Sequence, residues 1–510
     1  MATGANKKDD VLPSAETRLN TNFAVDLERN LAVEDDVDAA AALSARLESG
    51  AKITAGNPNS TNPHEWPRSK KWLVVAIASL YTFISPISSS MVAPALPAMA
   101  IDLGMTKIID LEMTLSIFVL AYAFGPLFLA PLSEVYGRYI VLQASLWFFT
   151  IFNLVCGFAQ NRSQILLFRF LAGLGGSAPL TISGSVIADL FKVSEMGAAM
   201  AYYALGVILA PALGPIIGGA LTQNATWHWV FYTVSIISAV LAIVGSFLLK
   251  ETFRPLLESR ARKEAAKKDP SLVLAHPEPN VAHLLSTAIM RPFIMLGTQP
   301  IAQVIALLMA FVYGIMYIVL TTYSSLFVEQ YGESTFTSTL HYLALLIGFL
   351  IGNRMSGSLI DVSSAYLQKR YNTPHKPEYR LPVCFAASIF LPVGLFLYGW
   401  AAEHNWHWAL VDFGIVLFSW SVNVTFQTLT VYTVDVYTMY SASALAAVGF
   451  LRSLAGFGFP LFAADMYSKY GYGWANSILA FVGLVIGVPA PILLYAYGEK
   501  IRAKSQFASG

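Results

Sequence analysis

Charged side chains inside apolar segments are the first candidates for chemistry in this sequence. Arg169 begins R-F-L-A-G-L-G-G-S-A-P-L, a run apolar enough to lie within a membrane. A charge there is costly, so a functional role is the default hypothesis. Because a guanidinium keeps its proton, Arg169 would bias a nearby carboxylate or hold water rather than carry the proton itself. The alternative is that the side chain extends to the lipid headgroups, since Arg169 lies close to one end of its segment.

A second set of charges lies in the short connection A-P-L-S-E-V-Y-G-R, which runs from Ala130 to Arg138. Gly137 permits a tight turn, and Arg138 presents a planar fork that matches carboxylates. Asp189, at the end of a later apolar segment, is the partner we expect, and Glu134 is a further carboxylate within the connection. The alternative is an ordinary surface ion pair with no role in function.

The run G-V-I-L-A-P-A-L-G-P-I-I-G-G is apolar throughout, yet it carries four glycines and two prolines. In water a proline alone costs about 3 kcal/mol in a helix interior, but a segment within a bilayer has no better alternative to a helix. We therefore expect a kinked helix with a face of small residues that another helix can approach closely. The pattern leaves open whether this face only packs or also takes part in a conformational change. The residues concerned are Gly206, Pro211, Gly214, Pro215, Gly218 and Gly219.

The composition indicates that membrane-spanning helices position these residues. The chain has 510 residues, of which 56% are hydrophobic and 12% charged, and its mean hydropathy is +0.57. Soluble domains carry about 25% charged residues, so this chain cannot hide its apolar surface in one soluble core. Twelve apolar segments are each long enough to cross about 30 Å of hydrocarbon. They lie near 72–94, 111–132, 140–159, 164–190, 196–221, 230–249, 295–320, 338–359, 382–401, 407–432, 442–466 and 474–497.

The same inventory excludes several classes of function. The net charge of +1 gives no case for nucleic-acid binding. The two cysteines, Cys156 and Cys384, fall within apolar segments, and of the eight histidines only His404 and His407 are close together. No metal site is therefore expected. The sequence has no G-x-x-x-x-G-K-[ST] loop and no nucleophile set, so neither ATP-driven transport nor an enzyme is expected, and no cofactor is predicted.

The distribution of lysine and arginine predicts the orientation. These residues gather before the first span, after the even-numbered spans and after the last span, whereas the outside loops hold only Lys107, Arg162 and Lys469. Under the positive-inside rule both termini are then cytosolic. The expected organisation is a disordered cytosolic tail with a short helix near 38–48, a six-helix half, a central cytosolic loop, a second six-helix half and a short cytosolic tail. These parts cover 1–71, 72–249, 250–294, 295–497 and 498–510.

Several motifs resemble those of the major facilitator superfamily. The connection that ends at Arg138 is similar to the loop signature G-x-x-x-D-x-x-G-R, with alanine and glutamate in place of the first glycine and the aspartate. The glycine- and proline-rich run resembles the antiporter signature of the fifth span, and the run that begins at Arg169 resembles the signature of the fourth. K-E-T-F-R-P-L-L (Lys250 to Leu257) and S-A-L-A-A-V-G-F-L-R-S-L-A-G (Ser443 to Gly456) are similar to stretches of fungal drug and polyamine exporters. The resemblance covers about 66–507 and favours the fungal 12-span drug:proton antiporter branch.

This resemblance implies an all-α membrane protein with twelve transmembrane helices in two six-helix halves. It further implies that Glu134, Arg138 and Asp189 latch the two halves in an outward-facing state, and that Arg169 takes part in proton coupling. In this fold most spans line a central cavity, and packing or lipid contact is the alternative role for any one aromatic residue there. The candidates for substrate contact are Tyr81, Tyr122, Tyr202, Tyr313, Tyr317, Trp420, Asn423, Phe426 and Gln427.

Three further charges belong to the second half of the chain. Arg452 is expected to pair with Asp435 or to extend to the headgroups. Asp412 is a weak candidate for the proton carrier, and a solvated carboxylate at the rim is the alternative. The sequence identifies no carboxylate deep within a span of the first half as a proton carrier.

The implied function is that of a secondary transporter that exports drugs, toxins or secondary metabolites by proton antiport with alternating access. The implied partners are a small-molecule substrate, protons and the lipid bilayer, with a monomer as the expected state. The expected location is the plasma membrane, with the vacuolar membrane as an alternative. Two other hypotheses stay open: an exporter dedicated to one toxin, glycolipid or organic acid, and a transporter-like membrane sensor. An unpaired arginine or lysine in the cavity would favour an acid.

Overall fold

The computed structural model describes residues 62–192, 195–268, 281–374 and 376–508. The expected tail and its helix near 38–48 therefore lie outside the described residues, apart from the last few positions of the tail. The short 3₁₀ helix η1 (Pro63–Glu65) belongs to a separate unit that ends at Trp66. Everything that follows concerns the unit that begins at Pro67.

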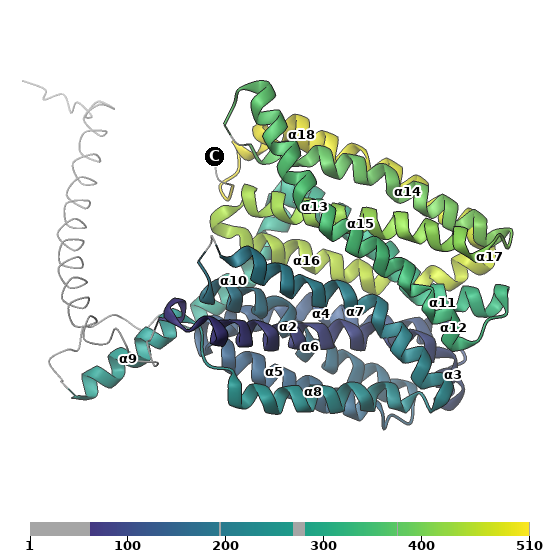
Figure 1. The fold of residues 1–510 in the computed structure, drawn as a ribbon, viewed down its shortest axis with the longest axis horizontal. Coiled ribbons are helices and arrows are strands. Elements are labelled where there is room, and N and C mark those ends of the chain that lie inside the picture. The colour runs from purple at the N-terminus through teal and green to yellow at the C-terminus, as the bar shows by residue number, and fades with distance from the viewer. Residues whose placement is uncertain (1–61, 193–194, 269–280, 375, 509–510) are drawn as a thin grey trace, which may run out of the picture. The chain divides into compact units, whose positions relative to one another are not determined.

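Helices make up almost the whole of this unit (Figure 1). In the first half they are α2 (Arg68–Ser90), η2 (Ala93–Ala95), α3 (Leu96–Asp102), α4 (Ile108–Tyr136), α5 (Arg138–Cys156), α6 (Arg162–Leu190), α7 (Met196–Asn224) and α8 (His228–Leu248). Then come α9 (Arg254–Lys268) and α10 (Val281–Thr298). In the second half they are α11 (Pro300–Tyr331), α12 (Thr335–Leu340), α13 (Tyr342–Tyr371), η4 (Pro377–Arg380), α14 (Leu381–Glu403), α15 (Trp408–Val436), η5 (Thr438–Tyr440), α16 (Ser441–Gly458), α17 (Pro460–Gly487) and α18 (Pro489–Arg502).

Twelve helical stretches in the described part of the chain are long and apolar enough to cross a membrane, as the sequence predicts. The main difference in bounds concerns the last two spans. The backbone breaks at Gly471, where φ is 69°, a value that glycine adopts at little cost. The predicted segments 442–466 and 474–497 lie on either side of this glycine. We call the side at which α2 begins and α18 ends the terminal side, and the opposite side the distal side.

The segment between the halves was expected to be a loop, and its described residues form α9 and α10 instead. Helix α10 packs against α4 of the first half and α16 of the second. Phe293 of α10 meets the Phe450 ring of α16 at 5.1 Å, and Phe124 of α4 meets the same ring at 5.7 Å. The helix was missed because its apolar part, Ala288–Thr298, is too short to resemble a span.

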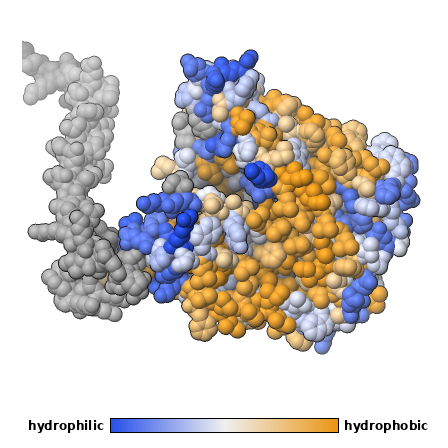
Figure 2. All heavy atoms as spheres, viewed as in Figure 1, coloured by the Kyte–Doolittle hydropathy of each residue, from blue (hydrophilic) through white to orange (hydrophobic). Residues whose placement is uncertain are grey.

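Apolar side chains lie both inside the bundle and on its outer surface. Helix α11 forms the centre of the core, and 83% of its most apolar 18-residue stretch is buried within the protein. Large apolar side chains elsewhere face outward, such as Phe247 and Val485, which are 80% and 73% exposed. In Figure 2 hydrophobic residues form a broad surface across the middle of the molecule, and hydrophilic residues gather toward the ends of the helices. Helices are the form in which such a chain satisfies its backbone within lipid.

Candidate functional site

The connection between α4 and α5 is built around the carboxylate of Glu251, which follows α8. Its oxygens accept hydrogen bonds from the backbone N–H groups of Arg138 (2.9 Å), Tyr139 (3.3 Å) and Phe253 (2.9 Å). Two of these donors open α5, where free N–H groups and the helix dipole favour an anion. Gly137, with φ of 105°, leaves the room that Glu251 occupies, since a Cβ there would overlap its carboxylate. The sequence analysis noted K-E-T-F-R-P-L-L only as a resemblance and assigned Glu251 no role.

The sequence predicts that Asp189 is the partner of Arg138, and the structure brings these two residues and Glu134 together. The Arg138 Nε atom lies 3.5 Å from Asp189 Oδ2, and its Nη1 lies 3.9 Å from Glu134 Oε1 and donates to Ser133 Oγ at 2.6 Å. The Glu134 side chain is 51% exposed. Among the described residues Glu134 makes no ion pair or hydrogen bond with α16, so a bond between the halves at this point is absent from this conformation.

Arg169 is completely buried and points into the first half, not to the headgroups. Its Nε donates to the Thr114 carbonyl (3.1 Å), and its Nη atoms donate to the carbonyls of Ser88 (3.1 Å) and Ser89 (3.4 Å). The guanidinium also lies 4.4 Å from the centre of the Phe118 ring. Helix α2 ends at Ser90, so its last carbonyls need donors from elsewhere. Among the described residues, the guanidinium of Arg169 bonds to carbonyls and lies over aromatic rings, and it forms no ion pair with the carboxylate that the sequence analysis expected beside it.

The small residues of α7 form two contact faces. A Cβ on Gly214 would overlap Ser90 of α2, and a Cβ on Gly218 would overlap the Met91 carbonyl, so α2 and α7 approach as closely as the sequence predicts. Gly206 packs on the same neighbour, beside Ser79. Gly219 faces the other way, toward Thr339 of α12 in the second half. Helix α7 remains helical through both Pro211 and Pro215.

A cavity of about 400 Å³ lies between α4, α6 and α16. At the terminal side it is bordered by Glu134 and Arg138, and farther in by Tyr122 and Arg452. Its lining mixes apolar surface with hydroxyl and charged groups, as a binding site for a small organic molecule does. The remaining lining residues are Ala123, Pro126, Ala130, Ser133, Ser177, Leu180, Thr181, Ile182, Gly184, Ser185, Ala442, Leu445, Ala446, Gly449, Phe450 and Ser453.

Four of the predicted contact residues lie together near the inner end of this cavity. The Tyr313 ring lies 4.9 Å from Tyr317 and 5.9 Å from Phe426, measured between ring centres. The Arg452 guanidinium lies 4.9 Å from the centre of the Tyr313 ring. Tyr122, which borders the same cavity, shares a 2.6 Å hydrogen bond with Ser85. These groups join α4 of the first half to α11, α15 and α16 of the second.

The other predicted contact residues lie elsewhere. The Tyr81 hydroxyl donates to Gln143 (3.0 Å) and to the Leu241 carbonyl (3.1 Å), which places it among α2, α5 and α8. Tyr202 is 52% exposed and stands edge-on to Trp72. We therefore place these two tyrosines outside the cavity. Sequence depth along a span does not tell which way a side chain faces.

Three residues of α15 also face away from the cavity. Trp420 meets Phe390 edge-on at 5.1 Å in a groove formed with α13 and α14. Asn423 packs on Gly352, and Gln427 donates to Asn353 at 3.5 Å, so both amides face α13. Asn423 and Gln427 lie four residues apart and share one face of α15, as predicted. That face contacts α13, and none of the three residues lines the cavity.

The ion pair expected between Arg452 and Asp435 is not formed. Asp435 pairs with Arg380 at 2.8 Å instead. The Arg452 Nε atom is buried with no hydrogen-bond acceptor among the described residues. A guanidinium that borders a cavity with an unused donor is available to an anionic or hydrogen-bonding ligand.

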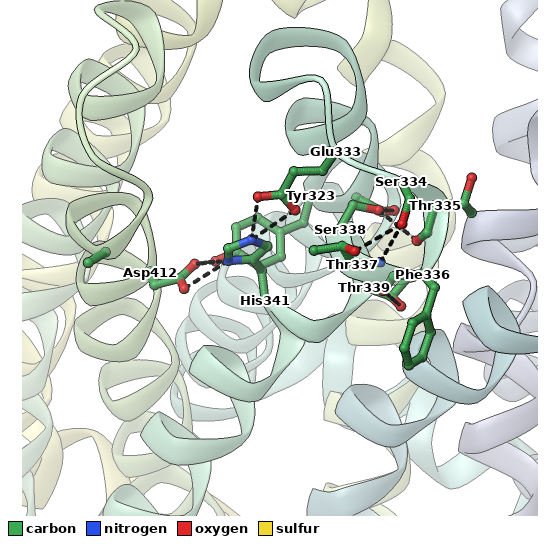
Figure 3. Close-up of polar contacts among 12 residues, drawn as sticks. Tyr323, Glu333, Ser334, Thr335, Phe336, Thr337, Ser338, Thr339, His341 and Asp412 are labelled. Carbon is green, nitrogen blue, oxygen red and sulfur yellow. Dashed lines mark hydrogen bonds and ion pairs between the residues drawn. The ribbon is translucent and has the colours of Figure 1, made fainter.

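At the distal side a histidine joins three helices (Figure 3). His341, which precedes α13, places Nδ1 2.9 Å from Asp412 Oδ2 and Nε2 3.2 Å from Glu333 Oε2. The Tyr323 hydroxyl donates to Asp412 Oδ1 at 2.6 Å, and the imidazole stacks on Phe327. Asp412 is therefore a bonded member of this group and not the solvated rim carboxylate considered above.

Helix α12, directly before His341, closes the distal side. The Phe336 N–H donates to Gln223 Oε1 of α7 at 2.7 Å, and Thr339 of α12 contacts Gly219. Helix α13 also packs on α7. The two halves thus meet at the distal side, while the cavity reaches the terminal side. Such an arrangement can hold a ligand that enters from one side only.

Comparisons with known proteins agree with this architecture. The model described as Major Facilitator Superfamily matches residues 78–460. The efflux pump vrtL of Penicillium aethiopicum is 42% identical over 457 residues, which are 89% of this chain and 91% of that relative. The efflux pump radE of Floropilus chiversii is 37% identical over 463 residues, which are 89% of this chain and 85% of that relative.

Solved structures show the same fold. The xylose transporter XylE from E. coli, in a partially occluded inward open conformation, superposes with a TM-score of 0.62 at 12% identity, covering 84% of this chain and 98% of that one. A bacterial homologue of the lysosomal transporter Spinster superposes with a TM-score of 0.61 at 14% identity, covering 85% and 98%. Since the family match and the relatives span most of the chain, this multi-pass membrane protein is a transporter, not an enzyme, and it belongs to the major facilitator superfamily.

Proposed function

We propose that this protein exports small organic compounds, such as secondary metabolites, by proton antiport with alternating access. The observation that carries the proposal is the cavity of about 400 Å³ that reaches the terminal side while α12 and α7 meet at the distal side. A binding site open to one side at a time is the basis of alternating access. The names of the relatives, which include efflux pumps, support export as the direction.

The proposed orientation places the terminal side in the cytosol and the protein, as a monomer, in the plasma membrane. Lysine and arginine follow the positive-inside rule in this arrangement. The structure then corresponds to an inward-facing state, in which the compound enters the cavity from the cytosol. In the outward-facing state α12 separates from α7, and the terminal ends of the two halves come together.

The half-exposed Glu134 is suited to that second state. In the present conformation its nearest cation is Arg138 at 3.9 Å, and Arg138 is already paired with Asp189. When the terminal ends approach, Glu134 can meet the free N–H groups at the start of α16, a favourable site for an anion. We therefore propose that Glu134, Arg138 and Asp189 stabilise the outward-facing state, and that Arg169 acts by fixing the end of α2 rather than by binding a proton.

Arg452 favours a narrower second candidate, an exporter dedicated to an acidic metabolite. Its guanidinium borders the cavity, and its Nε lacks an acceptor among the described residues. A carboxylate or phenolate in the cavity would supply that acceptor, and the rings of Tyr313 and Phe426 would pack against an aromatic body. A neutral compound would leave the charge without a partner.

The test is an efflux assay in yeast cells that lack their own drug pumps. Cells expressing the wild type are loaded with neutral, cationic and acidic fluorescent compounds, and the rate of loss is followed with and without a protonophore. We expect faster loss that the protonophore abolishes, for several compounds or, on the second candidate, for acids alone. A wild type present at the plasma membrane that changes the loss of none of these compounds would contradict both candidates.

A further inference from the structure

Four carboxylates are buried within the described residues, and one of them lacks compensation. Three are neutralised by their surroundings: Asp110 pairs with Arg162 at 3.0 Å, Glu378 pairs with Arg502 at 3.4 Å, and Glu251 accepts backbone N–H groups. The fourth is Glu112, which is 7% exposed, and its Oε2 atom is buried with no hydrogen-bond partner. Sequence analysis passed over Glu112 because it stands near the edge of its span.

Glu112 faces the second half across the distal contact. It lies in the second turn of α4, near the distal end of that helix. Its electrostatic neighbours include Thr321 of α11, whose hydroxyl donates to the Ile318 carbonyl at 3.0 Å, and Tyr342 of α13. Both neighbours belong to the second half, so this carboxyl is enclosed only while the two halves meet at the distal side.

The cations on the helices that pack against α4 are engaged elsewhere or lie far along the bundle. On α6, Arg162 pairs with Asp110 and Arg169 donates to three carbonyls. Arg452 on α16 lies over Tyr313, and no described cation comes within 4.0 Å of Glu112 as an ion pair. The remaining charged groups on the packed helices α2, α3, α5, α10 and α17 are Arg68, Lys70, Lys71, Asp102, Arg138, Arg291, Asp465 and Lys469.

An ionised carboxylate without a counter-ion is strongly unfavourable in such a site, and the group takes up a proton instead. Once the distal side opens, α11 and α13 withdraw, water reaches Glu112, and the ionised form becomes favourable. Proton binding and distal closure therefore favour each other, as linkage requires.

We propose that Glu112 is the carboxyl that binds the transported proton, and that the distal side closes only after this group is neutral. The proposal rests on the proton antiport of the proposed function and names the proton site within it. A proton from outside binds Glu112 in the outward-facing state, which permits closure and the return to the inward-facing state.

A row of hydroxyl groups leads from Glu112 toward the cavity. Thr321, Tyr317 and Tyr313 are spaced four residues apart on α11 and so share one face, over about 12 Å of helix. Tyr317 lies 3.5 Å from Ser89 between their hydroxyl oxygens, and Tyr313 lies beneath Arg452, which borders the cavity. In the inward-facing state the proton leaves Glu112 along these hydroxyls and water to the cytosol, and the resulting carboxylate, unfavourable in the closed site, drives the distal side open again.

The test uses the full chain in proteoliposomes and compares Glu112→Gln, which mimics the neutral acid, with the wild type. Two transport modes are measured: exchange of labelled for unlabelled substrate, which moves no net protons, and uptake driven by a pH gradient, followed together with proton flux by an internal pH dye. The substrate is whichever compound the wild type exports most rapidly in the yeast assay. Glu329→Gln, an exposed carboxylate on α11, is the matched control.

We expect Glu112→Gln to lose gradient-driven uptake and substrate-induced proton flux by roughly tenfold or more, and exchange with them, because a permanently neutral group keeps the distal side closed. Glu329→Gln should match the wild type in both modes. Gradient-driven uptake and proton flux in Glu112→Gln equal to those of the wild type would overturn the assignment while leaving antiport intact. A wild type with export but no response to the gradient would overturn antiport, and the assignment with it.

A second measurement distinguishes a distal side that is held closed from a chain that fails to fold. Thr339→Cys, at the closed contact between α12 and α7, is labelled from outside with a membrane-impermeant maleimide, in chains with and without Glu112→Gln. With Glu112 present, labelling should rise between pH 5.5 and pH 8 as the ionised carboxyl holds the distal side open. Because maleimides react with the thiolate, whose fraction rises with pH, each rate is divided by that of the denatured chain at the same pH. With Glu112→Gln the corrected rate should stay low at both pH values, and the same rise in both chains would overturn the proposal.

Discussion

Gly219 of α7 and Thr339 of α12 are in direct contact across the distal side, with no room for a Cβ between them. This contact joins the first half to the second at the point where the pathway is closed. A second bond, from the Phe336 N–H to Gln223 Oε1 at 2.7 Å, lies beside it. In the part of the chain that the structure describes, the halves are thus joined here by close approach and a hydrogen bond, and no ion pair links them at this point.

Replacing Gly219 by valine should therefore hold the distal side apart. The new side chain would have to displace Thr339, and overpacking of this kind typically costs about 1–3 kcal/mol. We expect greater labelling of a distal cysteine by an impermeant maleimide, with normal folding. Gly449→Val is the matched control, because a Cβ at Gly449 has nothing within 4 Å. Unchanged labelling of Gly219→Val would show that α12 does not set closure.

Arg169→Ala should destabilise the first half. Three carbonyls lose their donors, and an unpaired buried polar group costs about 1–3 kcal/mol. Arg169→Lys should restore little, because one ammonium cannot reach the carbonyls of both α2 and α4 in the way that the planar fork does. The measurement is the melting temperature in detergent by fluorescence-detected size exclusion, with the exposed Lys107→Ala as control. Full stability of Arg169→Lys would contradict this account.

Arg452→Gln should change which compounds are exported. Loss of the charge removes the partner for a carboxylate in the cavity, so we expect export of acidic compounds to fall about tenfold or more, the loss of roughly 1.4 kcal/mol of binding. Export of neutral compounds should persist, and Arg354→Gln, an exposed arginine on α13, should behave as the wild type. Equal loss for neutral and acidic compounds would indicate a structural role for Arg452.

Gly137→Ala should weaken the terminal side of the first half. The backbone has φ of 105° there, and the added methyl group would overlap the Glu251 carboxylate. Such strain costs about 1–3 kcal/mol. A lower melting temperature with substrate preference unchanged is the expected result. The open glycine Gly357 of α13 provides the comparison, since a Cβ there has no neighbour within 4 Å and the residue lies outside the cavity.

The membrane class and the spans could be predicted because apolar length and composition are local properties of the sequence. Contacts between motif residues could also be predicted, as for Arg138 and Asp189, whose Nε and Oδ2 atoms lie 3.5 Å apart. The direction in which each side chain of a span faces could not be predicted, because a helix that is apolar on all sides has no periodic hydrophobic pattern. The hydrophobic pattern of α7, for example, does not distinguish the face toward α2 from the face toward α12, and Tyr81 and Tyr202 were assigned to the cavity for the same reason.

Partners far apart in the sequence were the other part that could not be predicted. Glu251 meets Arg138 and Asp412 meets His341 only because the helices that carry them are neighbours in space. The sequence shows where a charged residue lies along its span, but it does not show whether a counter-ion or a hydrogen-bond donor lies beside that residue. For that reason Glu112, whose distinction is the absence of a cation around it, could be found only in the structure.

The carboxylate of Glu251 has a mechanical consequence for the chain between the halves. It follows α8, yet it holds the first N–H groups of α5, so the point where the chain leaves the first half is fixed to a helix more than a hundred positions earlier. Helix α9, which begins three residues later, therefore starts from a point that is fixed to two helices of the first half at once.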